Sequence, residues 1–306
     1  MINLFDIPNH VIDTSKFSHM LHGEIVSDFE QEFADYVGAK YACTANSASS
    51  LLFLSLLRFP RPQLVQIPST MPIVVPNAVV GAGHRIMFYN DIDWVGGYYH
   101  LHDDIFDSAQ EVTRNQFADL GKDDALMIFS FYPTKPVSGC DGGIVVSNNK
   151  DKIDHIRTMT MNGTSVNKDS WKREQIMAGY KMHWTSPQAF VASENLKKLD
   201  EKNSRLDQIK SAYNDAFGYN NTSRHLYRIR VNNNNGFLQT MQANGIMCGI
   251  HYEHCHGKRA FKEFEAQVAN LEPSEKESQR TVSLPYHSRL TDNEVDKVIY
   301  YVKKLT

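Results

Sequence analysis

The sequence is poor in long apolar runs and in paired cysteines. No stretch of its 306 residues is long and apolar enough to cross a bilayer, and the start, MINLFDIPNHVIDTSKF, lacks the basic and apolar regions of a signal peptide. The four cysteines show no CxxC spacing, which argues against a disulfide framework or a zinc ribbon; they are Cys43, Cys140, Cys248 and Cys255. We therefore expect a cytoplasmic protein with reduced thiols and no membrane partner.

An excess of charge of one sign is also missing. The chain has 32 Lys and Arg residues against 35 Asp and Glu residues, a formal net charge of -3 at pH 7, and no block of like charge. This balance gives no reason to expect a nucleic-acid partner, so small polar metabolites are the expected ligands. With 42% apolar residues the chain can build one large core and a smaller second one.

The first half alternates apolar strand-like runs with helix-like segments. The segment 27–38, SDFEQEFADYVG, places Phe29, Phe33 and Tyr36 on one helical stripe, with Gly38 as its stop. Further helices are expected over 47–57 and 74–83, and strands over 41–46, 64–68, 85–91, 103–110, 125–133 and 142–149. This order is typical of βαβ units and predicts an α/β fold.

The second half changes character near residue 200. Residues 150–200 are mainly helical in pattern and end in a long amphipathic helix over 194–217. A smaller α+β pattern follows, with strands expected over 226–231, 246–252 and 281–286 and helices over 236–245 and 291–305. We expect a large domain over 1–200, with an N-terminal arm over 1–26, and a small C-terminal domain over 201–306.

Lys135 is the first candidate for chemistry. It lies in FSFYPTKPVSGCDGG, after an apolar strand and before a glycine-rich turn, with the hydroxyls of Ser130 and Thr134 close by. An isolated lysine is usually a solvated surface charge. The glycines of the turn, however, allow a ligand to approach the backbone.

Asp107 strengthens the interpretation of Lys135 as a catalytic residue. It ends an apolar strand in DIFDSAQ, and open α/β sheets bind ligands at that edge. Pyridoxal phosphate needs an amine for covalent attachment and a carboxylate that keeps its ring nitrogen protonated. The alternative is that Asp107 only caps a following helix.

A serine-rich turn supplies the third element. Asn46-Ser47-Ala48-Ser49-Ser50 opens a predicted helix, and the free N–H groups at a helix N-terminus suit a phosphate. Many serine-rich turns of this kind bind nothing, so the signal is weak by itself.

Five separated segments together resemble the DegT/DnrJ/EryC1/StrS family of sugar aminotransferases, nearly end to end. Asp107-Ser108-Ala109-Gln110 is similar to the family's Asp-x-Ala-Gln or Asp-x-Ala-His motif, and Ser130-Phe131 through Lys135 to its Ser-Phe-x-x-x-Lys motif. The segments FEQEFADYVGAKYA, IHYEHCH and TVSLPYHSRLTDNEVDKVI also resemble family segments. The resemblance implies a fold-type I, aspartate-aminotransferase-like architecture: a mainly parallel sheet with helices on both faces and a small α+β domain.

The resemblance also implies roles for individual residues. Lys135 would bind pyridoxal phosphate covalently, Asp107 would pair with its ring nitrogen, and Gln110 would lie beside it. The phosphate would be held by Ser130, Ala48 and Ser49, with Ser47 as a further hydroxyl. Related enzymes that dehydrate sugars have histidine where this chain has Lys135, so transamination is the expected reaction, in a homodimer whose active site lies at the interface.

Three positions depart from the family pattern. Pro72 stands where the family has an aromatic residue stacked on the ring, and Ala48 replaces a threonine of the phosphate turn. Lys181 replaces an asparagine that reaches the phosphate across the dimer interface, a change that keeps a donor and adds a charge. Too few residues lie between NDIDW and DIFDSAQ for the usual extra strand and helix, so a smaller central sheet is expected.

The HYEHCH segment admits two interpretations. Its spacing fits none of the usual zinc patterns, so we predict no metal and a loop whose His251, Tyr252 and His256 contact substrate. Tyr132 is a further substrate candidate, with core packing as the alternative.

The expected activity is transfer of an amino group, from glutamate, to a keto sugar that is linked to a nucleotide. Two alternatives remain open at the level of the sequence. One is a degenerate cofactor-binding relative with a regulatory or structural role, suggested by Pro72, Ala48 and Lys181. The other is an aminotransferase for a ketone without a nucleotide, or for a cyclitol, suggested by the shortened loops.

Overall fold

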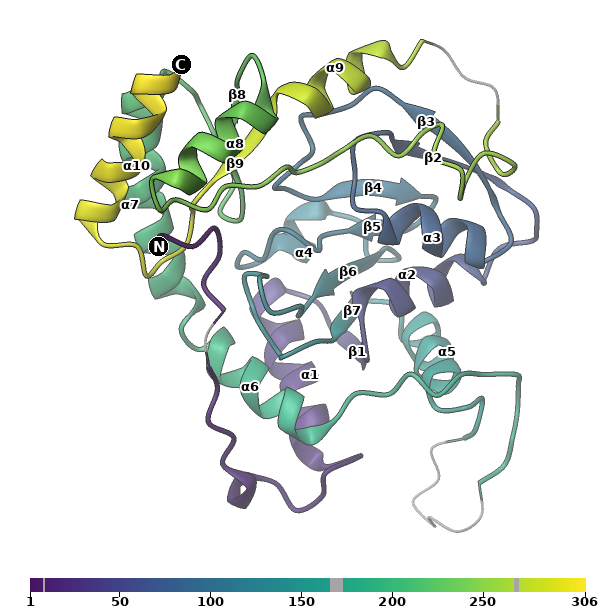
Figure 1. Cartoon of the computed structure of the whole chain (residues 1–306). Coiled ribbons are helices and arrows are strands. Elements are labelled where there is room, and N and C mark those ends of the chain that lie inside the picture. The colour runs from purple at the N-terminus through teal and green to yellow at the C-terminus, as the bar shows by residue number, and fades with distance from the viewer. Residues whose placement is uncertain (8, 166–172, 267–269) are drawn as a thin grey trace.

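The computed structural model describes residues 1–7, 9–165, 173–266 and 270–306 (Figure 1). A five-stranded sheet lies at its centre, in the spatial order β1 (Tyr41–Ala45), β7 (Gly143–Ser147), β6 (Leu126–Ser130), β5 (Ile105–Asp107), β4 (Tyr99–His102). A separate parallel pair is formed by β2 (Leu64–Pro68) and β3 (Arg85–Tyr89), and a small antiparallel pair by β8 (Tyr227–Arg230) and β9 (Thr281–Leu284).

Helices cover both faces of the central sheet, as predicted. The first half contributes α1 (Glu24–Val37), α2 (Ala48–Leu56), α3 (Val74–Gly81), α4 (Gln116–Leu120) and α5 (Lys150–Thr160). The second half contributes α6 (Ser186–Leu196), α7 (Leu199–Phe217), α8 (Asn234–Ala243), α9 (Glu272–Arg280) and α10 (Asp292–Leu305). A short 3-10 turn, Thr14–Lys16, interrupts the N-terminal segment.

Alternate residues of β6 enter different cores, which explains the two helical layers. Ile128 belongs to a core that includes buried residues of α2, α3 and α5, whereas Met127 and Phe129 belong to a core with α1 and α6. Because successive side chains of a strand point to opposite faces, a strand that is apolar throughout needs cover on both sides. The predicted α/β class is confirmed on this basis.

The pairing within the central sheet is less parallel than the resemblance implies. Only β5 and β6 pair in parallel, while β1–β7, β7–β6 and β4–β5 are antiparallel. The reversed directions belong to β7, which follows the Lys135 turn, and to β4, which forms an antiparallel ladder with β5. The shortened segment between β3 and Asp107 thus still provides the strand β4, but it contains no helix.

Three other expectations differ from the structure. The long helix expected over 194–217 is two helices, α6 and α7, separated at Lys197 and Lys198. Residues 246–252 form no strand; Ile246 and Gly249 make only isolated bridges, to Ile2 and Ser283. The described residues between α5 and α6 are largely irregular, so the helical pattern expected over 150–200 holds only at its two ends.

A third core is built mainly from the C-terminal part of the chain. It joins buried residues of α7, α8 and α10 with both strands of the small sheet, and Ile2 of the N-terminus packs into it. Phe261 and Cys255, by contrast, are buried in the core of the large sheet. The boundary at residue 200 and the arm over 1–26 stay predictions. Among the described residues, none of the helices combines the length and apolar character that a membrane crossing requires.

Candidate active site

The ends of two adjacent parallel strands bring Asp107 and Lys135 to one edge of the sheet. Asp107 is the last residue of β5, Ser130 is the last residue of β6, and the two strands pair in parallel. Lys135 follows β6 in a turn closed by a hydrogen bond from its backbone N–H to the Tyr132 carbonyl, 2.9 Å. The carboxyl edge of parallel strands is where open α/β sheets bind ligands.

Asp107 is buried, and its carboxylate is held in place by two donors. The Tyr99 hydroxyl donates to Oδ2 at 2.9 Å and the Ala109 backbone N–H donates to Oδ1 at 2.9 Å. Burial raises the pKa of Asp107 above its ordinary value, whereas the two hydrogen bonds and the charge of Lys135 act in the opposite direction. A carboxylate placed in this way can face a protonated ring nitrogen.

The amine of Lys135 is buried although the residue as a whole is only partly covered. Burial lowers the pKa of Lys135 to about 8, and the negative charge of Asp107 opposes that shift. A lysine with such a pKa has an appreciable neutral fraction near pH 7 to 8 and can serve as nucleophile and base. The two residues therefore share one buried region and affect each other's protonation.

The N-terminus of α2 has the features of an anion site. Ser47 caps the helix by accepting a hydrogen bond from the Ser50 N–H at 3.0 Å. Within the described residues, the N–H groups of Ala48 and Ser49 donate to no other group. Gly143 of β7 allows the helix to approach the sheet, because a Cβ there would lie 2.5 Å from the Ala48 nitrogen. Free helix amides beside buried Ser130 suit a phosphate.

The remaining predicted cofactor residues differ in burial and in their contacts. Gln110 is buried and accepts a hydrogen bond from the Gly96 N–H at 2.8 Å, so it fixes the loop that precedes β4. Pro72 lies partly buried just before α3. Lys181 is exposed, but the carbonyl of its neighbour Met182 accepts from the Asn46 N–H at 2.8 Å, which places its segment beside the serine-rich turn.

The predicted substrate residues do not form one cluster. His251 hydrogen-bonds through Nδ1 to the Ser283 hydroxyl at 2.9 Å, and burial, Lys135 and Arg228 lower its pKa to about 4. Burial and the charge of Asp107 raise the pKa of Tyr252, so both residues lie near the Lys135–Asp107 pair.

Of the two further substrate candidates, His256 lies apart from that pair, whereas the Tyr132 carbonyl accepts the Lys135 N–H at 2.9 Å. His256 contacts Ser69 and Glu275 instead, through its two ring nitrogens. Tyr132 is 53% exposed, which argues against its core-packing alternative and leaves its hydroxyl open to solvent.

Sequence reasoning missed three residues of the site. Tyr99 binds Asp107, and Trp94 packs on Tyr99 with ring centroids 4.6 Å apart and stacks on Tyr252 at 6.2 Å. His225 is buried, and its burial together with the charge of Lys135 lowers its pKa well below the ordinary value. Tyr99 lies in β4, whereas Trp94 and His225 lie outside the strands, and an isolated aromatic or histidine in such a place looks like core in a sequence, so no pattern could have identified them.

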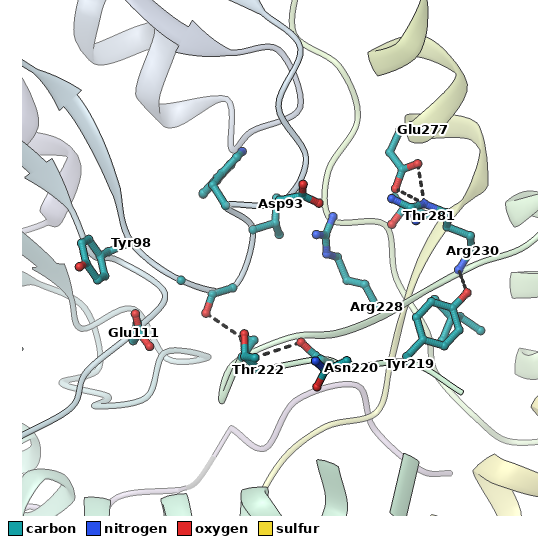
Figure 2. A pocket seen from close by; sticks show the side chains of 17 residues that line it. Asp93, Tyr98, Glu111, Tyr219, Asn220, Thr222, Arg228, Arg230, Glu277 and Thr281 are labelled. Carbon is teal, nitrogen blue, oxygen red and sulfur yellow. Dashed lines mark hydrogen bonds and ion pairs between the residues drawn. The ribbon is translucent and has the colours of Figure 1, made fainter. Parts of the chain in front are cut away.

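A cleft of about 570 Å³ lies apart from Lys135, between the loop before β4 and the small sheet. Figure 2 shows Asp93, Tyr98 and Glu111 on one side of it and Tyr219, Arg228 and Glu277 on the other. Lys135 instead lines a cavity of about 70 Å³ together with Phe5 and His225. The chemistry of the donor groups, rather than cavity size, therefore locates the candidate active site.

Comparison with known proteins identifies the family of the chain. The profile of the DegT/DnrJ/EryC1/StrS aminotransferase family matches residues 6–93 and 105–303. A UDP-4-amino-4,6-dideoxy-N-acetyl-beta-L-altrosamine transaminase of Campylobacter jejuni is 24% identical over 325 residues, 88% of this chain and 86% of its own. The spore coat polysaccharide biosynthesis protein SpsC of Bacillus subtilis is 25% identical over 362 residues, 96% of this chain and 93% of its own.

Solved structures show the same fold. PseC of Helicobacter pylori, an aminotransferase involved in the biosynthesis of pseudoaminic acid, superposes with a TM-score of 0.80 at 18% identity, covering 99% of both chains. DesV of S. venezuelae superposes with a TM-score of 0.79 at 20% identity, covering 94% of this chain and 90% of its own.

The fold is thus that of the fold-type I aminotransferases. The chain belongs to the DegT/DnrJ/EryC1/StrS aminotransferase family, as its resemblance predicts. The family implies pyridoxal phosphate as cofactor, and the residues present fit it: a buried amine, a buried carboxylate and a helix N-terminus with free amides. The 94–104 segment outside the family match contains Trp94 and Tyr99.

Proposed function

We propose that the protein transfers an amino group from glutamate to a keto sugar that is linked to a nucleotide, in the biosynthesis of a surface polysaccharide or a secondary metabolite. The observation that carries the proposal is the buried pair of Lys135 and Asp107 at the ends of neighbouring strands. The choice of a keto sugar as the amino-group acceptor is supported by the similarity to sugar transaminases such as the Campylobacter jejuni enzyme.

Lys135 and Asp107 have different chemical tasks. When bound, pyridoxal phosphate supplies a ring that withdraws electrons from the donor carbon losing its proton. Lys135 would attach the cofactor and, once released, its neutral amine would remove that proton and later return one on the acceptor side. Asp107 holds the proton on the ring nitrogen and so maintains the electron demand of the ring. The pKa of Lys135, lowered to about 8, suits this alternation.

The residues around α2 would bind and orient the phosphate. Ala48 and Ser49 offer their N–H groups, while the hydroxyls of Ser47 and Ser130 lie at the same edge. In the proposed dimer, Lys181 of the second copy would add a positive charge to the phosphate across the interface. Gln110 and Pro72 would border the ring of the cofactor, the first through the loop that it fixes and the second by packing.

The acceptor would meet residues from two parts of the chain. The charge of Lys135 acts on the pKa of His251 and that of Asp107 on the pKa of Tyr252, which places both within electrostatic reach of the pair, and Tyr132 is 53% exposed. His256 is also assigned to the acceptor side, although its contacts favour a structural task. Neutral His251 would accept or donate a hydrogen bond to a sugar hydroxyl without adding charge.

A homodimer with the active site at the interface completes the proposal. The N-terminal segment exposes apolar side chains that a second copy would cover, with Ile7 63%, Val11 92% and Met20 58% exposed. Ile176 and Tyr180, near Lys181, are also exposed. Exposed apolar patches of this kind are typical of protein interfaces. Sedimentation equilibrium would give twice the mass of the chain, and a monomer would contradict the dimer. The cytoplasm is the proposed location, with free thiols at all four cysteines as support.

The acceptor is tested by transfer of label. Protein loaded with pyridoxal phosphate receives ¹⁵N-glutamate and, in separate reactions, a UDP-linked 4-keto-6-deoxy sugar, a free keto sugar and a keto cyclitol. The proposal predicts ¹⁵N in the UDP-linked product and no transfer by Lys135→Ala. Label only in the aminated free sugar or cyclitol would move the function to that acceptor class, and the absence of both ¹⁵N-labelled products and 2-oxoglutarate released from glutamate would support the degenerate relative.

A further inference from the structure

A second cluster of chemically competent side chains lies outside the Lys135 site. His254 and His256 belong to the HYEHCH segment, Glu275 belongs to α9, and one ligand atom from each lies within 4.8 Å of the others. The segment is fixed against the end of β2, because the Cys255 N–H donates to the Ser69 carbonyl at 2.8 Å and His254 forms an antiparallel bridge with Thr70.

The hydrogen bonds of His254 determine which of its nitrogens is free. Its Nδ1 lies 3.0 Å from the hydroxyl of Ser278, and that hydroxyl donates its only hydrogen to the Glu275 carbonyl at 2.8 Å. Ser278 must therefore accept from Nδ1–H, which leaves the lone pair on Nε2. Within the described residues, this Nε2 has no hydrogen-bond partner.

His256 is oriented in a similar way by a second serine. Its Nδ1 lies 2.5 Å from the hydroxyl of buried Ser69, and its Nε2 lies 3.0 Å from Oε1 of Glu275. Without a metal ion, the Nε2–H of His256 donates to Glu275. On metal binding the proton would move to Nδ1, the Ser69 hydroxyl would rotate to accept from Nδ1–H, and the Nε2 lone pair would become available to the ion. Metal-binding histidines are typically fixed through the other ring nitrogen in this manner.

We propose that His254, His256 and Glu275 bind a divalent transition-metal ion of the zinc class. Two imidazoles and a carboxylate are ligands that Zn²⁺ accepts, and a fourth position would hold water. The ligand atoms must approach one another, since bonds of about 2.0 to 2.2 Å place ligands closer together than 4.8 Å. Rotation of the Glu275 side chain, which is 50% exposed, provides that adjustment.

The ion would have a structural effect on the edge of the cofactor site. It would tie α9 and the HYEHCH segment to the end of β2, which continues through Met71 into Pro72. Cys255, between the two histidines, already donates to the Met71 carbonyl at 3.3 Å. Within the described residues, none of its three ligands hydrogen-bonds to Lys135 or Asp107, so the ion would take no part in proton transfer there, and a metal-bound His256 would have this structural task in place of the acceptor contact.

The test uses untagged full-length protein, freed of metal with a chelator and titrated with Zn²⁺ and with Co²⁺. We expect one ion per chain, a rise in the thermal unfolding midpoint on adding Zn²⁺, and visible absorption of Co²⁺ in a site with nitrogen ligands. His254→Gln and Glu275→Gln should each weaken binding by about tenfold or more. His19→Gln, at an exposed histidine remote from the cluster, is the control and should bind as the unaltered protein does.

Two outcomes would overturn the proposal. Absence of saturable binding of both ions by the unaltered protein means that the cluster is only a hydrogen-bond network. Binding that survives unchanged in both variants means that the ion sits elsewhere in the molecule. Glu275 is on the surface, so Glu275→Gln is expected to fold and keeps the test decisive if His254→Gln does not.

Discussion

Tyr99→Phe isolates the support that this chain gives to Asp107. The substitution keeps the ring that packs on Trp94 and removes only the hydroxyl that donates to Asp107 Oδ2 at 2.9 Å. A hydrogen bond to a charged group contributes about 1.5 to 3 kcal/mol. Its loss leaves the buried carboxylate with one donor, the Ala109 N–H. We therefore expect affinity for pyridoxal phosphate to fall by about tenfold to a hundredfold.

The direction of the pH dependence follows from the same bond. Burial already raises the pKa of Asp107, and the Tyr99 hydroxyl is one of the groups that lower it. Without that donor the pKa of the carboxyl rises further, so cofactor affinity should begin to fall at a higher pH in the variant than in the unaltered protein. Equilibrium titration of the apoprotein with pyridoxal phosphate between pH 5 and 8, followed by absorbance, measures both effects.

Tyr98→Phe is the matched control, because the adjacent Tyr98 is 40% exposed and has no contact with Asp107 in the structure. It should bind the cofactor as the unaltered protein does. Equal affinity and equal pH dependence in Tyr99→Phe and Tyr98→Phe would refute the reasoning, and the 94–104 segment would then have no part in the cofactor site.

Three further predictions concern the pair and the phosphate turn. Asp107→Asn should lower kcat about a hundredfold or more while the protein stays folded, measured by glutamate turnover. Covalent attachment of pyridoxal phosphate should accelerate with pH up to about 8 and then level off, because the neutral amine of Lys135 reacts; acceleration that continues to pH 10 in a stopped-flow series would contradict the lowered pKa. Gly143→Ala should destabilise the fold by about 1 to 3 kcal/mol and weaken cofactor binding, since the new Cβ would meet the Ala48 nitrogen. Gly81→Ala, with only the Phe53 ring at 3.7 Å, should do neither in the same denaturant titration.

The strands that carry the site were predictable because they are apolar on both faces. Composition alone predicts strands over 125–133 and 142–149. As expected, Asp107 ends β5 and Lys135 lies in the turn that follows β6. The directions of β4 and β7 could not be predicted, since an apolar run looks the same whichever way the strand runs. The resemblance also contained no information on Tyr99.

The missed helix α9 shows a different limit. Its sequence, EPSEKESQR, is polar all round, and only Ser274 and Ser278 are buried. Helix prediction relies on an apolar stripe, and here that stripe is absent. The buried serines instead bond outward, Ser274 to Asn90 and Ser278 to His254, so tertiary hydrogen bonds replace apolar contacts. The break between α6 and α7 is likewise invisible in an uninterrupted helical pattern.

The central claim is that Lys135 carries the cofactor and glutamate reacts there. The most direct measurement is the absorbance spectrum of the protein with pyridoxal phosphate, before and after excess glutamate, followed by borohydride reduction and peptide mass spectrometry. The account predicts a covalent band that borohydride fixes to Lys135, and its conversion by glutamate to the pyridoxamine phosphate form. A protein that forms no band, or a reduced adduct on a lysine other than Lys135, would contradict it.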